Sequence, residues 1–294
     1  MTIDLKGMIS PVISSFTQND AVDEGLYAQH VDRLIDAGMH GVSPGGSTGE
    51  GAALDDDELS AMVKIARRGA GDRPVVAGVI RSSTAAAVRT GKVARDAGAD
   101  ALMVTPTFYN VLVPNDDGNL DFYSRVSDEV GLPIVIYNVV PQNTISPELF
   151  VRMRGEVENL VGVKQSVGGV HSLYAMRIAD PDALAYAATD EMLYTCFSLG
   201  ADGAISAILA LFPELSIRLW DLHASGDHAE AMRIQAELHR VWTRITGPQF
   251  PARLKEALRQ RGVDGGLSRS PSTPIDPATQ QAIARALAEL DERL

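Results

Sequence analysis

Short apolar runs alternate with longer stretches of helical periodicity from near the N-terminus to about residue 225. Most of the short runs are apolar throughout, which is typical of parallel strands that are covered on both faces. The helical stretches between them supply the crossover connections that parallel pairing requires. The pattern predicts eight strands, at residues 8–13, 41–43, 74–79, 101–105, 133–137, 160–164, 183–187 and 203–206.

Glycine recurs where the predicted helices meet the following strands, in the segments Asp36-Ala37-Gly38, Asp96-Ala97-Gly98 and Leu199-Gly200. Glycine adopts the left-handed conformation that ends a helix before the chain turns into a strand. The spacings between these joints are near two and three multiples of a βαβ unit of about 30 residues. Eight such units predict an α/β fold of the closed (β/α)8 TIM barrel type, with a doubly wound open sheet as the alternative.

The pattern becomes helical without strands after Ser225. Helices are expected at residues 227–245, 252–261 and 277–294, with Pro248 and Pro251 in the interruption between the first two, and a Gly, Ser and Pro-rich loop at 262–274. We therefore predict a barrel over residues 1–225 and a C-terminal helical region over residues 226–294. The expected role of this region is packing on the barrel or subunit contact.

Composition narrows the classes of function. The net charge of -12 argues against nucleic acid and anionic membrane surfaces as partners and favours a small-molecule ligand. A lone cysteine, Cys196, excludes an intramolecular disulfide, and no Cys and His cluster or His-x-x-x-His pair predicts a metal site. With neither a signal-peptide pattern nor an apolar run of 18 residues, we expect a cytoplasmic protein.

Two polar side chains close predicted strands. Lys164 follows the apolar run 160–163, and Tyr137 follows the run 133–136. An amine at the mouth of an apolar strand is poorly solvated as a cation, so its free base becomes available as a nucleophile toward carbonyls. Because the active site of a barrel lies at the carboxyl ends of its strands, this placement indicates a Schiff-base enzyme. The alternative is a lysine that merely leaves the sheet and extends into water.

A glycine-rich loop, Gly-Gly-Ser-Thr-Gly-Glu at residues 45–50, follows the second strand and shares the predicted rim with Thr105. It fits the G-x-S-x-G pattern of serine hydrolases, but no helix obviously starts behind Ser47 and no later histidine stands out as its base. A phosphate-binding P-loop would need Gly-Lys-Ser/Thr, which is absent. The loop is then either a cradle for the carboxylate of a 2-oxo acid, formed by backbone N–H groups with the Ser47 and Thr48 hydroxyls, or an ordinary turn.

Four ordered motifs resemble one enzyme family. They are Gly45-Gly46-Ser47-Thr48-Gly49-Glu50, Val104-Thr105-Pro106 with Phe108 and Tyr109, Tyr137-Asn138-Val139, and Val161-Gly162-Val163-Lys164-Gln165. In order and spacing they are similar to the dihydrodipicolinate synthase and N-acetylneuraminate lyase family. The resemblance continues through residues 200–203 and 271–274, so it covers most of the chain. It implies a class I, metal-free (β/α)8 enzyme, usually a homotetramer built as a dimer of dimers, that needs no cofactor besides the imine its lysine forms with pyruvate or another 2-oxo acid.

The resemblance also implies roles for single residues. Lys164 would be the Schiff-base lysine, and Tyr137 the proton shuttle, since a phenol beside a cationic imine can act as acid and base. Ser47 would relay protons and, with Thr48, bind the substrate carboxylate. Tyr109, or Phe108 if the register differs by one, would match the tyrosine that the family inserts across a subunit interface.

Departures from the family pattern bear on the substrate. The synthases carry an arginine a few residues after the Tyr-Asn-x-Pro segment, where this chain has Pro141-Gln142-Asn143-Thr144 with one extra residue before the proline. Ser166 and the pair Asp190-Glu191 look like the lyase side of the family, where such residues bind the hydroxylated tail of a sugar acid. The alternative for Asp190-Glu191 is an acidic pair at a helix N-terminus, favoured by the helix dipole.

The sequence therefore predicts a Schiff-base lyase or aldolase with pyruvate as product or co-substrate, resembling N-acetylneuraminate lyase or 2-keto-3-deoxygluconate aldolase. Dihydrodipicolinate (4-hydroxy-tetrahydrodipicolinate) synthase is the alternative within the family. A non-catalytic 2-oxo acid sensor that retains the barrel is the alternative of a different class.

Overall fold

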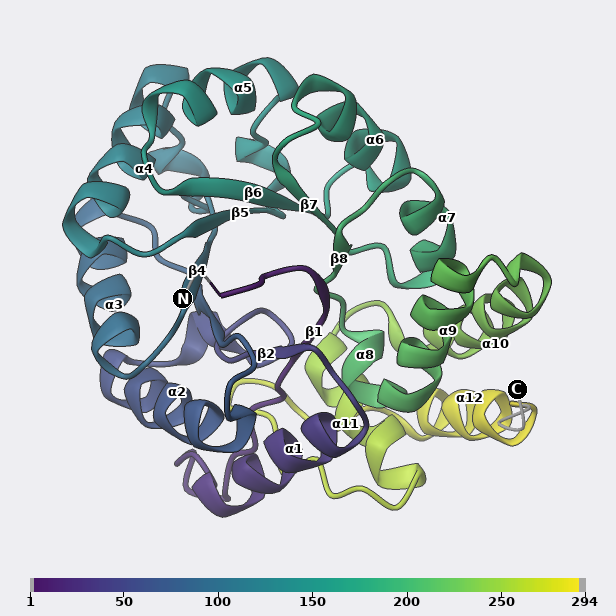
Figure 1. The fold of residues 1–294 in the computed structure, drawn as a ribbon. Coiled ribbons are helices and arrows are strands. Elements are labelled where there is room, and N and C mark those ends of the chain that lie inside the picture. The colour runs from purple at the N-terminus through teal and green to yellow at the C-terminus, as the bar shows by residue number, and fades with distance from the viewer. Residues whose placement is uncertain (1–2, 291–294) are drawn as a thin grey trace.

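The computed structural model describes residues 3–290 and contains a ring of parallel strands surrounded by helices (Figure 1). The strands are β1 (Gly7–Pro11), β2 (Gly41–Ser43), β3 (Val76–Val79), β4 (Ala101–Val104), β5 (Ile134–Asn138), β6 (Leu160–Gln165), β7 (Leu184–Ala187) and β8 (Gly203–Ala204). They pair in the order β2-β1-β8-β7-β6-β5-β4-β3. A parallel bridge between Val42 and Val75 joins the two ends. The sheet is thus a (β/α)8 barrel, and the alternative of an open doubly wound sheet is wrong.

Helices connect successive strands and form the outer ring (Figure 1). They are α1 (Glu24–Asp36), α2 (Asp56–Ala70), α3 (Thr84–Asp96), α4 (Asp116–Val130), α5 (Pro147–Glu156), α6 (Gly169–Ala179), α7 (Leu193–Ser198) and α8 (Ile208–Leu211). Short 3-10 helices also occur in the loops, namely η1 (Gly51–Ala53), η2 (Asn110–Leu112), η3 (Pro141–Asn143) and η4 (Asp190–Met192). After β8 and α8 the chain continues through four more described α-helices (Figure 1). They are α9 (Pro213–Ser225), α10 (His228–Ile245), α11 (Phe250–Gln260) and α12 (Pro277–Ala288).

Local sequence signals set the helix boundaries. The Asp55 side chain accepts a hydrogen bond from the Glu58 N–H while the Glu58 carboxylate accepts from the Asp55 N–H, so a capping box starts α2. The predicted glycine joints are confirmed, because Gly38 and Gly98 take φ values of 91° and 101° just after α1 and α3. These conformations end each helix and turn the chain toward the next strand.

The C-terminal helices are confirmed with shifted ends. The structure places α10 at His228–Ile245, with Asp227 as its N-cap. Pro251 does not precede α11 as predicted but lies in its first turn, where proline is tolerated because that N–H has no partner within the helix. The last predicted helix is α12, and the part of the prediction over residues 291–294 lies outside the described residues.

Apolar side chains fill two regions, one between the strands and the helix ring and the other inside the barrel. The interior cluster comprises Leu5, Ile9, Val76, Ala101, Met103, Val135, Tyr137, Tyr186 and Ile205. The Tyr186 hydroxyl donates a hydrogen bond to the Leu5 carbonyl, which satisfies a buried polar group within the barrel. None of the described helices is long and apolar enough to cross a membrane.

Candidate active site at the carboxyl ends of the strands

Lys164 and Tyr137 lie side by side at the mouth of the barrel. They are direct partners in the parallel pairing of β5 and β6. Side chains alternate between the two faces of a strand, so partners in adjacent strands point to the same side. The Lys164 Nζ atom lies 3.8 Å from the centroid of the Tyr137 ring. Both side chains are about 95% buried, with 5% exposed fractions.

The Lys164 amine has no carboxylate partner within 4.0 Å among the residues that the structure describes. Lys255 is a useful contrast, because it is equally buried but lies 2.6 Å from a Glu50 carboxylate oxygen. Burial lowers the pKa of Lys255, and the Glu50 carboxylate acts in the opposite direction. Lys164 instead faces the ring of Tyr137.

The glycine loop (residues 45–50) brings Ser47 to Tyr137. The Tyr137 hydroxyl donates a 3.1 Å hydrogen bond to the Ser47 Oγ atom. The loop reaches this position by packing directly on β3, where a Cβ atom added to Gly78 would lie 2.3 Å from the Gly45 carbonyl oxygen. A side chain at residue 78 would therefore displace the loop. Ser47 is paired with a phenol, which does not fit the serine-hydrolase alternative.

The same loop offers unpaired hydrogen-bond donors. Its backbone turns inward through hydrogen bonds from Gly51 N to Gly46 O, 2.9 Å, and from Glu50 N to Ser47 O, 3.1 Å. The N–H groups of Ser47 and Thr48 donate to no other group in the described chain. Ser47 is exposed whereas Thr48 is 6% exposed. Adjacent free N–H groups of this kind form concave anion-binding sites.

Asp190 is buried near Lys164, with 7% of its surface exposed. Burial raises its pKa to about 6, while the Ser206 hydroxyl, the Ile208 N–H and the positive charge of Lys164 act in the opposite direction. Its Oδ1 atom accepts a 2.7 Å hydrogen bond from the Ile208 N–H at the start of α8. Asp190 therefore binds a helix N-terminus, although not that of the helix that follows it in sequence. Glu191 beside it is half-buried.

Two of the predicted residues lie farther from the lysine and phenol. Ser166 follows the last residue of β6 and is half-buried. Tyr109 lies before η2 on the surface, with 57% of its surface exposed, together with exposed Val111 and Leu112. Phe108 is half-buried. The described chain thus brings together Lys164, Tyr137 and Ser47, whereas Tyr109 points away from the molecule's own interior.

Asn143, in the segment where the family resemblance implies an arginine, has an amide that is already satisfied. Its Nδ2 atom donates to the Thr107 carbonyl, 3.0 Å, and its Oδ1 atom accepts from the Asn119 Nδ2 atom, 2.9 Å. The side chain is 5% exposed. It is therefore occupied by the protein and presents no cation to a substrate carboxylate.

Sequence reasoning missed a pair that supports the site from outside the barrel. Asn138 and Gln165 each follow a candidate catalytic residue, are partners in the β5–β6 pairing, and form a 2.9 Å hydrogen bond. Asn138 also bonds the backbone of Ile145 in both directions. In the sequence, each amide directly follows Tyr137 or Lys164. That the two amides meet can be inferred only once the register between β5 and β6 is known.

A closed parallel barrel with a buried lysine and a phenol on adjacent strand ends defines a class, the (β/α)8-barrel enzymes. The comparisons with known proteins are more specific. Residues 4–290 match the model of the dihydrodipicolinate synthetase family. The chain belongs to this family of lyases.

Three relatives illustrate the similarity. The 4-hydroxy-tetrahydrodipicolinate synthase of Agrobacterium fabrum is 33% identical, over 96% of this chain and 97% of the relative. The structure of YagE, an Escherichia coli K12 prophage protein of the dihydrodipicolinic acid synthase family in complex with pyruvate, matches with a TM-score of 0.90 at 26% identity, over 97% and 98% of the two chains. CdNal from Clostridium difficile, in complex with mannosamine, matches with a TM-score of 0.88 at 25% identity, over 98% and 100%.

The raised pKa of Asp190 predicts a pH-dependent effect of Asp190→Asn on stability. Because the Asp190 carboxyl binds its proton more tightly in the folded protein than in the unfolded chain, its protonation stabilises the fold. This contribution is lost as the pH rises from the usual pKa of an aspartate to about 6. The free energy of unfolding of the variant relative to wild type should therefore increase from pH 4 to pH 7, by up to about 3 kcal/mol. Urea denaturation across this range measures the difference, and a constant difference would contradict the burial argument.

Proposed function

We propose that this protein is a class I lyase that uses Lys164 to form an imine with a 2-oxo acid, with pyruvate as product or co-substrate. The observation that carries the proposal is the buried Lys164 amine, which forms no ion pair with a carboxylate in the described part of the chain and lies 3.8 Å from the Tyr137 ring centroid. The amine adds to the keto carbon, and loss of water gives the imine. The cationic nitrogen then accepts the electron pair of the C3–C4 bond as that bond breaks and an aldehyde leaves. Hydrolysis releases pyruvate and restores the amine without a metal or cofactor.

Tyr137 and Ser47 are proposed to move the protons. The phenol is hydrogen-bonded to the Ser47 hydroxyl, so a proton can pass along this pair. Breaking the C3–C4 bond requires removal of the proton from the C4 hydroxyl and, later, protonation of C3. A single acid-base group beside the imine can serve both steps. The free N–H groups of Ser47 and Thr48 would hold the oxo acid's carboxylate.

A deoxy sugar acid is the substrate class that we favour. The segment at residues 141–144 has no arginine, and the Asn143 amide is already bonded within the protein. Ser166 and Glu191 offer hydroxyl and carboxylate groups suited to a hydroxylated chain, and Asp190, whose Oδ1 already accepts from the Ile208 N–H, would add its second oxygen. The similar CdNal binds mannosamine in its solved structure, which supports this class.

The second candidate is 4-hydroxy-tetrahydrodipicolinate synthase, favoured by curated relatives of that name, including one at 33% identity. It would condense pyruvate with aspartate semialdehyde. Against it stands the lack of a cation at residue 143 to pair with the second carboxylate.

We also propose a homotetramer, arranged as a dimer of dimers in the cytoplasm, in which Tyr109 enters the neighbouring subunit's site. The exposed side chains of Tyr109, Val111 and Leu112 form an apolar surface of the kind that a partner subunit buries. A partner subunit that buries this surface would complete the proton relay with the tyrosine hydroxyl.

Incubation with pyruvate and sodium borohydride should add one reduced pyruvyl group, on Lys164. Borohydride delivers hydride to the imine carbon and fixes the adduct as a secondary amine. Lys255 is an internal control, because it is equally buried but paired with Glu50 and should remain unmodified. Peptide mass spectrometry locates the adduct; an unmodified Lys164, or an adduct on Lys255 alone, would remove the mechanism and favour the sensor alternative.

A panel of 2-keto-3-deoxy sugar acids should release pyruvate, measured with a coupled lactate dehydrogenase assay. Aspartate semialdehyde with pyruvate should turn over at least about 100-fold more slowly, because an unpaired substrate carboxylate costs several kcal/mol of transition-state binding. Faster turnover of aspartate semialdehyde than of every sugar acid would establish the synthase instead.

A further inference from the structure

Glu50, the last residue of the glycine loop, has a strained backbone. Its φ and ψ of 52° and 32° are left-handed, which is uncommon for a residue with a Cβ atom. It lies directly after Ser47, Thr48 and Gly49, and its N–H donates to the Ser47 carbonyl. The Glu50 conformation therefore closes the turn that presents the two free N–H groups. Such a conformation persists only where its surroundings hold it.

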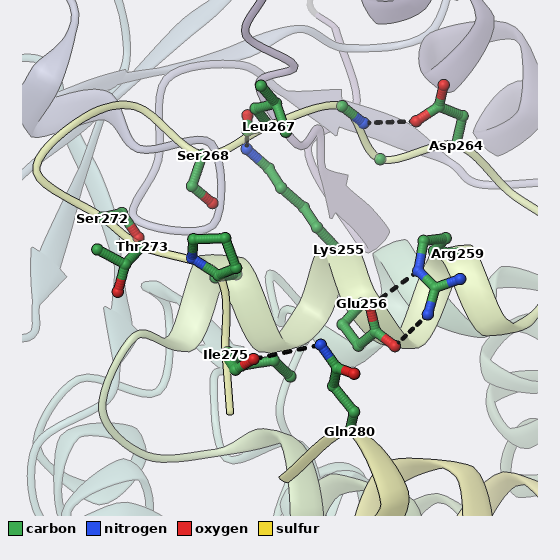
Figure 2. Close-up of a pocket in the computed structure, with 14 residues that line it drawn as sticks. Lys255, Glu256, Arg259, Asp264, Leu267, Ser268, Ser272, Thr273, Ile275 and Gln280 are labelled. Carbon is green, nitrogen blue, oxygen red and sulfur yellow. Dashed lines mark hydrogen bonds and ion pairs between the residues drawn. The ribbon is translucent and has the colours of Figure 1, made fainter. Parts of the chain in front are cut away.

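The surroundings that hold Glu50 come from the far end of the chain. One carboxylate oxygen accepts a 2.6 Å bond from Lys255 on α11, and the other accepts a 3.0 Å bond from the Arg269 N–H. Lys255 also donates to the Leu267 carbonyl, 2.6 Å. Figure 2 shows the Lys255 side chain leaving the helix and ending beside Leu267. The side chains of the pair are only 5% and 9% exposed.

This ion pair is separate from the catalytic mouth. Lys255 lines a cavity of about 310 Å³ between α11 and residues 264–275, and no residue of β5 or β6 contributes to that lining. The Lys255 stem forms one wall of the cavity (Figure 2). The carboxylate of Glu50 thus extends from the glycine loop toward the C-terminal segment, while Ser47 extends toward Tyr137.

Other contacts fix the segment just after the loop. Arg269 donates to the Ala53 carbonyl, 2.6 Å, and Arg81 donates to the Leu54 carbonyl, 3.0 Å. These contacts hold η1 and its end, but they do not reach Ser47 or Thr48. Within the turn, the Ser14 hydroxyl donates to the Gly49 carbonyl, and among the described residues the Glu50 carboxylate ties the turn to the C-terminal segment.

We propose that the buried Glu50–Lys255 pair is a positioning element that holds the Ser47–Thr48 turn ready for the carboxylate of the oxo acid. A buried ion pair is weak support for stability, because replacing both ions by neutral groups of similar size is often tolerated. The ion pair nevertheless has a specific effect on geometry. It fixes the left-handed Glu50 next to the free N–H groups of Ser47 and Thr48. The C-terminal helical region thereby contributes to substrate binding without touching the substrate. This inference rests on the proposed function, which supplies the oxo acid.

The test compares borohydride trapping of pyruvate and of hydroxyacetone, a ketone without a carboxylate, in wild type and Lys255→Met. The variant should need at least about ten-fold more pyruvate for half-maximal trapping, because a mobile turn must be ordered during binding. The maximal extent of trapping at saturating pyruvate should stay the same, because Lys164 is unchanged. The hydroxyacetone concentration for half-maximal trapping should be equal in both proteins.

Two further variants separate positioning from general destabilisation. Lys92→Met breaks an exposed ion pair with Glu129 and should leave pyruvate trapping unchanged. Glu50→Gln combined with Lys255→Met removes both buried charges, so its Tm should recover relative to Lys255→Met while its weak pyruvate binding persists.

Each other outcome is decisive. Unchanged half-saturation in Lys255→Met, a parallel loss for hydroxyacetone, or recovery of pyruvate binding together with Tm in the double variant would overturn the positioning role while leaving the Schiff-base function intact. A wild-type chain that traps neither ketone would overturn the proposed function, and the positioning role with it.

Discussion

The site depends on the register between β5 and β6. Tyr137 pairs with Lys164, so both side chains point to the inside of the barrel at its mouth. A slip of β6 by one residue would turn Lys164 toward the helices and bring the Gln165 amide inside, away from Tyr137. The hydrogen bond between these two amides, together with the Asn138 contacts to Ile145, stabilises the observed register from the outer face. Strand pairing therefore determines the chemistry of the barrel mouth.

The two buried lysines show how surroundings determine the role of a side chain. Lys255 is held by the Glu50 carboxylate and the Leu267 carbonyl, so its charge is compensated and its position is fixed. Lys164 has an aromatic ring beside it and a carboxyl group, Asp190, whose charge is disfavoured by burial. The same residue type thus serves as an anchor on one side of the glycine loop and as a candidate nucleophile on the other.

The barrel could be predicted because its signals are local. Unbroken apolar runs and glycine joints such as Gly38 and Gly98 report strands and helix ends within a few residues. Lys164, Tyr137 and Ser47 could be grouped because carboxyl ends of parallel strands meet at one rim. The Glu50–Lys255 pair spans 205 residues, and the Asp190 bond to Ile208 depends on where α8 begins, so neither has a local signal. The role of Tyr109 depends on a second subunit, which one sequence does not specify.

The most direct measurement of the central claim is exchange of the pyruvate methyl protons for deuterium in D2O, followed by proton NMR. An imine on Lys164 makes these protons acidic, and Tyr137 with Ser47 would carry them away. Wild type should therefore wash out the methyl signal, Lys164→Arg should abolish the exchange, and Tyr137→Phe should slow it by at least about 100-fold. Exchange at the wild-type rate in Lys164→Arg would contradict the account.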